Sequence, residues 1–176
     1  LAILKSASID LATRLAPLQD MGETWRLLES SCLISAHGRG PFRRLRVLEP
    51  VSYAILNSAD PKVVSRVREQ TYCAVAEWAF QHSRLLTDAK QDLAFANIAA
   101  EMDGIRSAID WALEHSPSLA AYLTVGAWRT VCARGNPSSD AYRFLSAASN
   151  GAGGLSNGLA GEAWVGAAIN LSVIGQ

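Results

Sequence analysis

The stretch from residue 101 to 116, EMDGIRSAIDWALEHS, has helical spacing but more apolar surface than a helix on a protein surface needs. One apolar stripe includes Ile105 and Ile109, and a second stripe beside it includes Ala108 and Trp111. At about 100° per residue, the two stripes merge into an apolar arc of roughly 200°. The arc predicts a helix that is covered by two neighbours, with Trp111 mostly buried, as in stacked pairs of helices. The charged side chains gather on the remaining side: Asp103, Arg106, Asp110 and Glu114.

The composition predicts a folded protein. The chain has 176 residues, of which 49% are hydrophobic and 18% are charged, enough for a sizeable core. Because sixteen basic residues balance sixteen acidic ones, no overall field attracts the chain to nucleic acid or to an anionic membrane. No signal peptide or convincing membrane span is visible, so we expect a cytoplasmic protein. The chain starts at Leu1 and ends on an apolar helical pattern, and we expect it to be an internal piece of a longer protein.

The three cysteines, Cys32, Cys73 and Cys132, lie far apart, and no Cys-x-x-Cys or Cys/His cluster accompanies them. This pattern argues against a disulfide framework and against a metal site, so we expect three buried free thiols. We predict no metal-binding or cofactor-binding residues.

The first part of the chain has the pattern of an incomplete winged-helix domain. Helical spacing covers residues 4–20 and 23–31, and two β-like runs follow at residues 32–35 and 42–48. A turn that contains Gly and Pro separates the two runs, which predicts a hairpin. A helix then starts at Pro50, because proline suits the first turn of a helix. The order helix, helix, hairpin, helix is expected of a winged-helix domain without its first elements.

From Asp60 onward the pattern is helical only. Asp60 is suited to cap a helix that starts at Pro61, and the apolar stripe of that helix includes Val67, Thr71 and Trp78. Further helices are expected at residues 88–113, 119–134, 139–149 and 159–174.

The last of these helices is similar to the first helix of a tetratricopeptide repeat (TPR). Such repeats begin with the pattern W-x2-L-G-x2-Y, and the family commonly places Gly four residues after the Tyr. Trp164, Ala167, Ala168, Leu171 and Gly175 lie at these spacings, with Ala for Leu, Ala for Gly and Leu for Tyr. The second helix of such a repeat would follow the end of the chain, so we expect the repeat domain to be truncated there.

Three further runs carry a larger resemblance. Residues 44–51 read RLRVLEPV, and residues 103–113 read DGIRSAIDWAL. They are similar to R-F-R-L-L-E-P-V-R and to D-N-L-R-A-A-L-D-W-A-L in bacterial STAND regulators, the signal-transduction ATPases related to NB-ARC proteins. A later W-R, R-G and R-W-L series of that family resembles Trp128-Arg129, Arg134-Gly135 and Arg143-Phe144-Leu145. The chain departs from the family at Tyr53, one place earlier than the usual Tyr, and at Gly104, where Asn is usual.

The resemblance implies a bacterial regulator in which an ATPase switch precedes a winged helix and helical repeats. The repeats of such regulators sense an inducer or a protein partner. The ATPase chemistry itself is not expected in this chain, because no G-x-x-x-x-G-K-[ST] run occurs and Gly38-Arg39-Gly40 lacks the Lys and Ser/Thr of a phosphate loop. The Gly-rich stretch at residues 151–158 also lacks Lys, and we interpret it as a linker.

Polar clusters give little indication of catalysis. The histidines are separated and stand in no nucleophile-elbow context: His37, His82 and His115. The densest basic cluster lies on the predicted hairpin: Arg39, Arg43, Arg44 and Arg46. A hairpin of this kind can touch a DNA backbone, but the zero net charge favours a solvated strand face or an ionic contact with an ATPase module. We therefore predict no catalytic residues.

Together these patterns predict a mainly α chain. Residues 1–58 would form the C-terminal part of a winged-helix-like domain with a small β-hairpin, and residues 59–176 an α-solenoid of TPR-like helical hairpins. The predicted function is the regulatory, sensor and protein-interaction region of a STAND-type ATPase signalling or transcriptional regulator, and not an enzyme. The expected partners are a protein or small-molecule inducer on the repeats and the nucleotide-binding domain of the parent chain, without DNA or membrane contact. Two alternatives stay open: a winged-helix DNA-binding module with a helical dimerisation arm, and a stand-alone helical-repeat adaptor.

Overall fold

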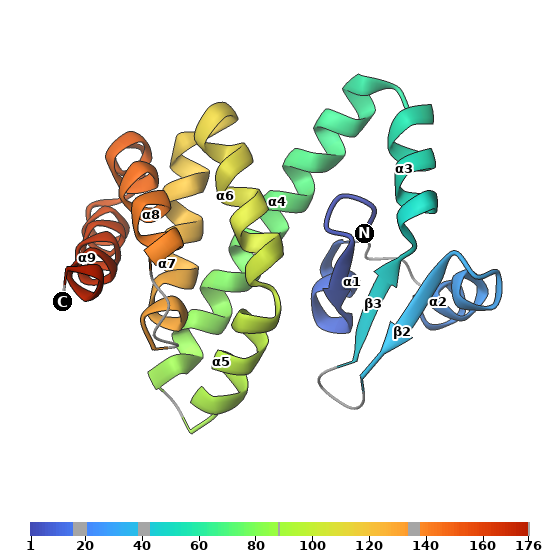
Figure 1. Cartoon of the computed structure of the whole chain (residues 1–176), viewed down its shortest axis with the longest axis horizontal. Coiled ribbons are helices and arrows are strands. Elements are labelled where there is room, and N and C mark those ends of the chain that lie inside the picture. Colours follow the sequence, from blue (N-terminus) through green and yellow to red (C-terminus); the bar gives the residue numbers. More distant parts are fainter. Residues whose placement is uncertain (16–20, 39–42, 88, 134–137, 176) are drawn as a thin grey trace. The chain divides into compact units, whose positions relative to one another are not determined.

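The computed structural model describes residues 1–15, 21–38, 43–87, 89–133 and 138–175. These residues are mainly helical and include a small antiparallel sheet, as predicted (Figure 1). The chain divides into two compact units, Leu1–Ala74 (unit 1) and Val75–Gln176 (unit 2), and the division falls inside helix α4, Pro61–Arg84. The predicted domain boundary between residues 58 and 59 lies just before α4 and stays a prediction.

Unit 1 contains a three-stranded antiparallel sheet with the strand order β1–β3–β2 among the described residues. Ile34 pairs with Val47 and Ala36 pairs with Leu45, which confirms the predicted hairpin. Ile34, Leu45 and Val47 are buried, so the alternation along β3 directs one face of the sheet into the core. The strands are β1 Ser6–Ser8, β2 Ile34–His37 and β3 Arg44–Val47.

Strand β1 contradicts the helix predicted for residues 4–20. Helix α1 begins only at Ile9 and ends at Leu15. Lys5 has a φ of 61°, and its carbonyl accepts a hydrogen bond from the amide of Val47. Pairing with β3 therefore overrides the helical spacing of the first residues. The end of the predicted helix, residues 16–20, lies outside the described residues.

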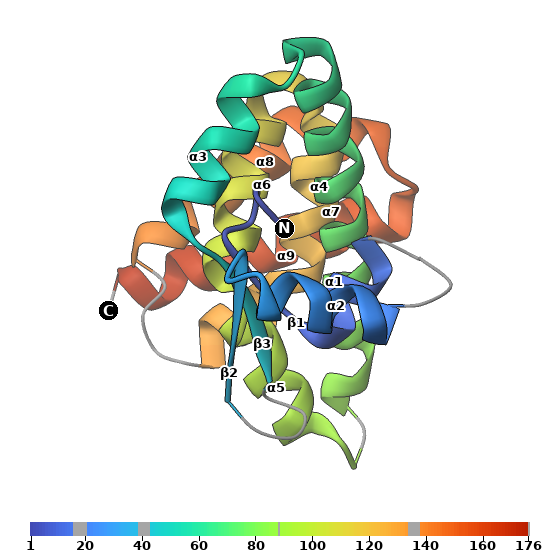
Figure 2. The ribbon, with the colours of Figure 1, turned by 90° about the vertical axis from the view of Figure 1, so that its right-hand side faces the viewer.

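Two helices of unit 1 pack against its sheet. Helix α1 contacts β1 and β3, and α2 contacts β2 (Figure 2). Helix α4 starts as predicted, because the amide of Lys62 donates to Oδ1 of Asp60 at 2.8 Å. Thr71 and Trp78 are buried as predicted, whereas Val67 is 43% exposed, so its assignment to the buried stripe was wrong. The remaining helices of this unit are α2 Met21–Ser30 and α3 Glu49–Ser58.

Unit 2 is helical throughout its described residues. The helix predicted for residues 88–113 is two helices, which meet at Glu101. The side chain of Glu101 is buried and its backbone, at φ −98° and ψ 2°, leaves the helical region. After the end of α4 come the short 3-10 helix η2 Leu85–Thr87, α5 Gln91–Ala100, α6 Met102–His115, α7 Pro117–Ala133, α8 Ser138–Gly151, the 3-10 helix η3 Ala152–Gly154 and α9 Asn157–Ile174.

Helix α6 has the multiple neighbours that its wide apolar arc predicts. It contacts α5, α7 and α8, and Ile105, Ala108 and Ile109 are fully buried. Trp111 is partly buried, in line with the expectation that most of this side chain is covered. Its indole ring stacks on the imidazole of His115, with 4.7 Å between the ring centroids, at the edge of the helix contact.

Helix α7 is buried on nearly all sides. This is expected, because its sequence has no polar side. Small residues allow its neighbours to approach closely. A Cβ added to Gly126 would lie 2.9 Å from Cβ of Ala79 on α4, and one added to Gly166 of α9 would lie 2.6 Å from Cγ of Trp128. Helices α6 to α9 pack against one another, while the TPR-like solenoid stays a prediction. In the part of the chain that is described, no helix combines the length and apolar character of a membrane span.

Candidate functional site

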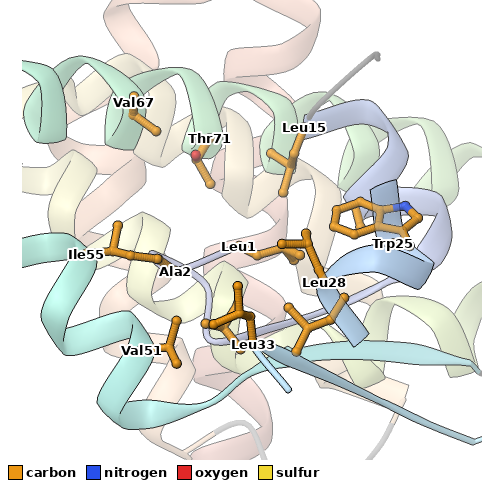
Figure 3. Close-up of a pocket in the computed structure, with 13 residues that line it drawn as sticks. Leu1, Ala2, Leu15, Trp25, Leu28, Leu33, Val51, Ile55, Val67 and Thr71 are labelled. Atoms are coloured by element: carbon orange, nitrogen blue, oxygen red, sulfur yellow. The ribbon is translucent and has the colours of Figure 1, made fainter. Parts of the chain in front are cut away.

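Unit 1 contains an apolar groove of about 360 Å³ (Figure 3). Helices α1 to α4 and the first residues of the chain all contribute to it. Each of these helices contributes apolar side chains to the groove. The main lining side chains are Leu1, Leu15, Trp25, Leu28, Leu33, Val51, Ile55, Val67 and Thr71.

The groove offers contact surface rather than chemistry. None of the side chains that line it is ionisable, and Thr71 and Trp25 carry its polar side-chain groups. Ile55 and Val67 are 48% and 43% exposed, which is high for large aliphatic side chains. A charged ligand would lose hydration here without gaining a partner, so the groove suits apolar groups.

The predicted basic cluster on the hairpin is partly neutralised. Nη2 of Arg43 lies 3.6 Å from Oε2 of Glu29, and Nε of Arg44 donates to Oγ of Ser6 at 3.3 Å. Arg46 is exposed, and Arg39 lies outside the described residues.

The three histidines make local contacts and are not brought together. His37 Nε2 lies 2.9 Å from Oγ of Ser35, and Nδ1 of His82 and of His115 lies 2.9 Å from the carbonyl oxygen four residues earlier. Within the described ranges, no group of three or more His, Cys, Asp or Glu side chains could hold a metal ion. The prediction of buried thiols was wrong for Cys32 and Cys73, which are exposed, and Cys132 is partly buried.

The charged side of α6 is joined to α8 by an ion-pair network centred on Asp140. The carboxylate of Asp140 is fully buried, and it accepts hydrogen bonds from Nε and Nη2 of Arg106 at 2.9 and 2.7 Å. Nη1 of Arg143 donates to the same carboxylate at 2.9 Å. Arg143 also donates to both oxygens of Asp110, and Arg106 to Asp103. Asp103, Asp110 and Glu114 are exposed, as expected for the wetted side of the helix, and Arg106 is partly buried beside Asp140.

The two arginines of the network are held strongly in their charged form. The hydrogen bond to Asp140 raises the pKa of Arg106, and the hydrogen bond to Asp110 raises that of Arg143. These carboxylates are engaged with arginine, so we assign the network to helix packing and not to substrate contact. Asp140 was missed in the sequence, although its position in the first turn of a helix, three residues before Arg143, is a usable signal.

A second polar group joins α4, α7 and α9. Glu162 of α9 forms ion pairs with Arg129 at 2.5 Å and with Arg84 at 3.7 Å. Tyr122 donates a hydrogen bond to Oε2 of Glu77 at 3.1 Å. Burial, this hydrogen bond and the nearby negative charge raise the pKa of Tyr122 to about 12. The predicted Gly-rich linker is mostly helical, since it contains the end of α8, η3 and the start of α9.

Comparisons with protein-family models, with curated proteins and with solved structures found no match for this chain.

Proposed function

We propose that this chain is the regulatory and protein-interaction region of a STAND-type ATPase regulator of the bacterial cytoplasm, without catalytic chemistry of its own. The ion-pair network supports the resemblance. Asp103, Arg106 and Asp110 of one quoted run and Arg143 of another, far apart in sequence, meet around Asp140. Residues that share one structural task are expected to recur together in a family's sequence pattern.

The apolar groove of unit 1 is the single observation that carries the interaction role. Exposed aliphatic side chains gathered in one concave surface are typical of sites that receive another protein segment. In the proposed parent protein, the nucleotide-binding module is the partner, and apolar side chains of that module fill the groove. Release of this contact would link the state of the ATPase to the helical unit.

The strand order β1–β3–β2, with α1 and α2 between β1 and β2, favours a second candidate function, a winged-helix DNA-binding module. In such a module α2 would be the recognition helix. However, α2 exposes Glu23 and Glu29 beside Arg26, and these carboxylates would repel phosphates. This candidate therefore ranks second, and a stand-alone adaptor ranks third. A phosphate-loop motif in the preceding sequence would favour the ATPase regulator over both.

Two valines one turn apart on α4 allow a matched test. Val67 lines the groove and Val63 does not, yet their side chains are 43% and 41% exposed. We expect the chain to co-elute with the nucleotide-binding module of its parent in size-exclusion chromatography. Val67→Asp should abolish co-elution, because a carboxylate would be desolvated in the contact, and Val63→Asp should preserve it.

If both variants co-elute with the module, or neither does, the groove is not the contact surface. The isolated chain should also show no saturable ATP binding in calorimetry. A sequence-selective complex with duplex DNA at physiological salt, lost on changing Arg44 and Arg46 to Ala, would promote the second candidate.

A further inference from the structure

The outward face of the sheet in unit 1 is basic and rich in hydroxyl groups. Ala7, Ile34 and Leu45 are buried, so the residues that alternate with them lie on the opposite face of the sheet. These outward residues carry two guanidinium groups, an imidazole and three hydroxyls, and none of them is acidic: Ser6, Ser8, Ser35, His37, Arg44 and Arg46. The charge of this face therefore attracts anions.

The strand register places Arg46 between two serines. Arg46 pairs with Ser6 of β1 on one side and with Ser35 of β2 on the other. Directly opposite side chains on neighbouring strands have Cβ atoms about 4.5–5.5 Å apart, so both hydroxyls lie close to a group that binds the guanidinium. Arg46 is exposed, and both serines are partly buried. Three donor side chains thus stand in one row across the sheet.

The hydrogen bonds of the two serines leave their hydroxyl protons available. Nε of Arg44 donates to Oγ of Ser6 at 3.3 Å, so Ser6 is already an acceptor. Oγ of Ser35 lies 2.9 Å from Nε2 of His37, and the imidazole donates to it in the tautomer that has its proton on Nε2. A hydroxyl that accepts from one neighbour donates its own proton to another group. Ser6 and Ser35 are thereby prepared to donate to an anion that binds Arg46.

We propose that Arg46, Ser6 and Ser35 bind the phosphate monoester of a phosphorylated serine or threonine on a partner protein. A phosphate monoester has three acceptor oxygens, one for each donor side chain, and a charge of about −1.5 to −2 at neutral pH. A nucleic-acid phosphodiester has only two free oxygens and one charge, and a carboxylate likewise has two oxygens. Because Arg46 and His37 are exposed, the site receives a group that projects from a partner and does not enclose a whole small molecule. The proposal rests on the sheet alone and does not depend on the proposed function of the groove.

An NMR titration of the full 176-residue chain, labelled with ¹⁵N, tests the site. The probe is a capped Ala–phosphoserine–Ala peptide. We expect saturable shifts of the amide signals of β1, β2 and β3. The unphosphorylated peptide, and the same peptide with Glu in place of phosphoserine, should bind at least about 10-fold more weakly, because they offer fewer charged acceptor oxygens.

Three variants separate the proposed site from general attraction to positive charge. Arg46→Gln should weaken binding of the phosphopeptide at least about 10-fold, because it removes the charged donor. Arg43→Gln is the matched control, since Arg43 is also exposed but lies directly before β3, on the side of Glu29, and it should leave binding nearly unchanged. The double variant Ser6→Ala, Ser35→Ala keeps every charge and should still weaken binding.

Equal losses in Arg46→Gln and Arg43→Gln would overturn the proposal, because the attraction would then be general. Full binding by the double serine variant would overturn it as well. Titrations with inorganic phosphate and with a short DNA duplex at physiological salt identify the source of the phosphate. If either of them shifts the same amide signals and the phosphopeptide does not, the partner is not a phosphorylated protein.

Discussion

Units 1 and 2 enclose their large side chains to different degrees. In unit 2, alanine and glycine line the helix contacts, and the close approach of the helices leaves Trp78, Ile109 and Phe144 almost fully buried. In unit 1, Tyr53 and Ile55 on α3 are 73% and 48% exposed. Small residues at helix contacts close a core, while large residues on helices that do not meet leave one open. The open groove of unit 1 is the surface that we propose for recognition, and the tight helix contacts of unit 2 are assigned to stability.

The largest expected effect tests whether unit 2 has the closed core. Trp78 is 1% exposed, so Trp78→Ala should lower the free energy of unfolding by about 3–5 kcal/mol, through lost burial and a cavity. Ile55→Ala in the groove of unit 1 should cost less than about 1 kcal/mol, because its side chain is already half in water. Urea denaturation gives the free energy of unfolding of both variants. Similar losses would mean that the core of unit 1 is as closed as that of unit 2.

A smaller effect is expected for the ion-pair network of unit 2. Asp140→Asn keeps the shape of the side chain but weakens its hydrogen bonds with Arg106 and Arg143, and we expect a loss of about 2 kcal/mol. The partial exposure of both arginines keeps this value below that for an isolated buried pair. Asp103→Asn is the control: the Asp103 side chain is fully exposed, so no measurable change is expected. Thermal unfolding at neutral pH compares the two variants. Melting temperatures lowered by the same amount in both would contradict the special role of the buried carboxylate.

The smallest expected effect concerns Tyr122 at high pH. Its pKa of about 12 in the folded chain is above the ordinary value of 10.0, so the folded state keeps a proton that the unfolded state loses. The contribution of the neutral phenol is fully present below pH 10 and is lost as the pH rises toward 12. Tyr122→Phe should therefore be slightly less sensitive to alkali over this range than the parent chain. Ultraviolet absorbance of tyrosinate, followed as the pH rises in the parent chain and in Tyr122→Phe, checks the assignment. If the variant lacks a tyrosine whose pKa is near 10, the assignment of the raised pKa to Tyr122 is wrong.

The sequence predicted the helical class, the hairpin and most helices of unit 2, because apolar spacing and the caps at Asp60 and Pro61 are local signals. It missed β1, because three residues of strand are too short to alternate visibly and depend on pairing with a strand far along the chain. It missed the break at Glu101 because the apolar pattern continues across it. The stripe of Trp111 predicted a mostly covered side chain, and the side chain is partly buried.

The candidate sites were harder to predict than the fold. The groove is set by how far apart four helices lie, and helical spacing contains no information about that distance. Asp140 could be recognised as a helix-start residue, yet its burial depends on Arg106, which is 34 residues away in sequence. The helix at residues 159–174 was expected from its apolar spacing, but periodicity alone does not say which side is covered, and Trp164 is 45% exposed.

The contact between Gly126 and Ala79 has a genetic consequence. A glycine codon mutates by single-base changes only to residues that carry at least a Cβ, and here that atom would lie 2.9 Å from Cβ of Ala79. Every missense change at this codon therefore forces α4 and α7 apart, at a cost of about 1–3 kcal/mol or more. The codon for Gly126 should therefore carry silent substitutions in natural populations and almost no missense changes.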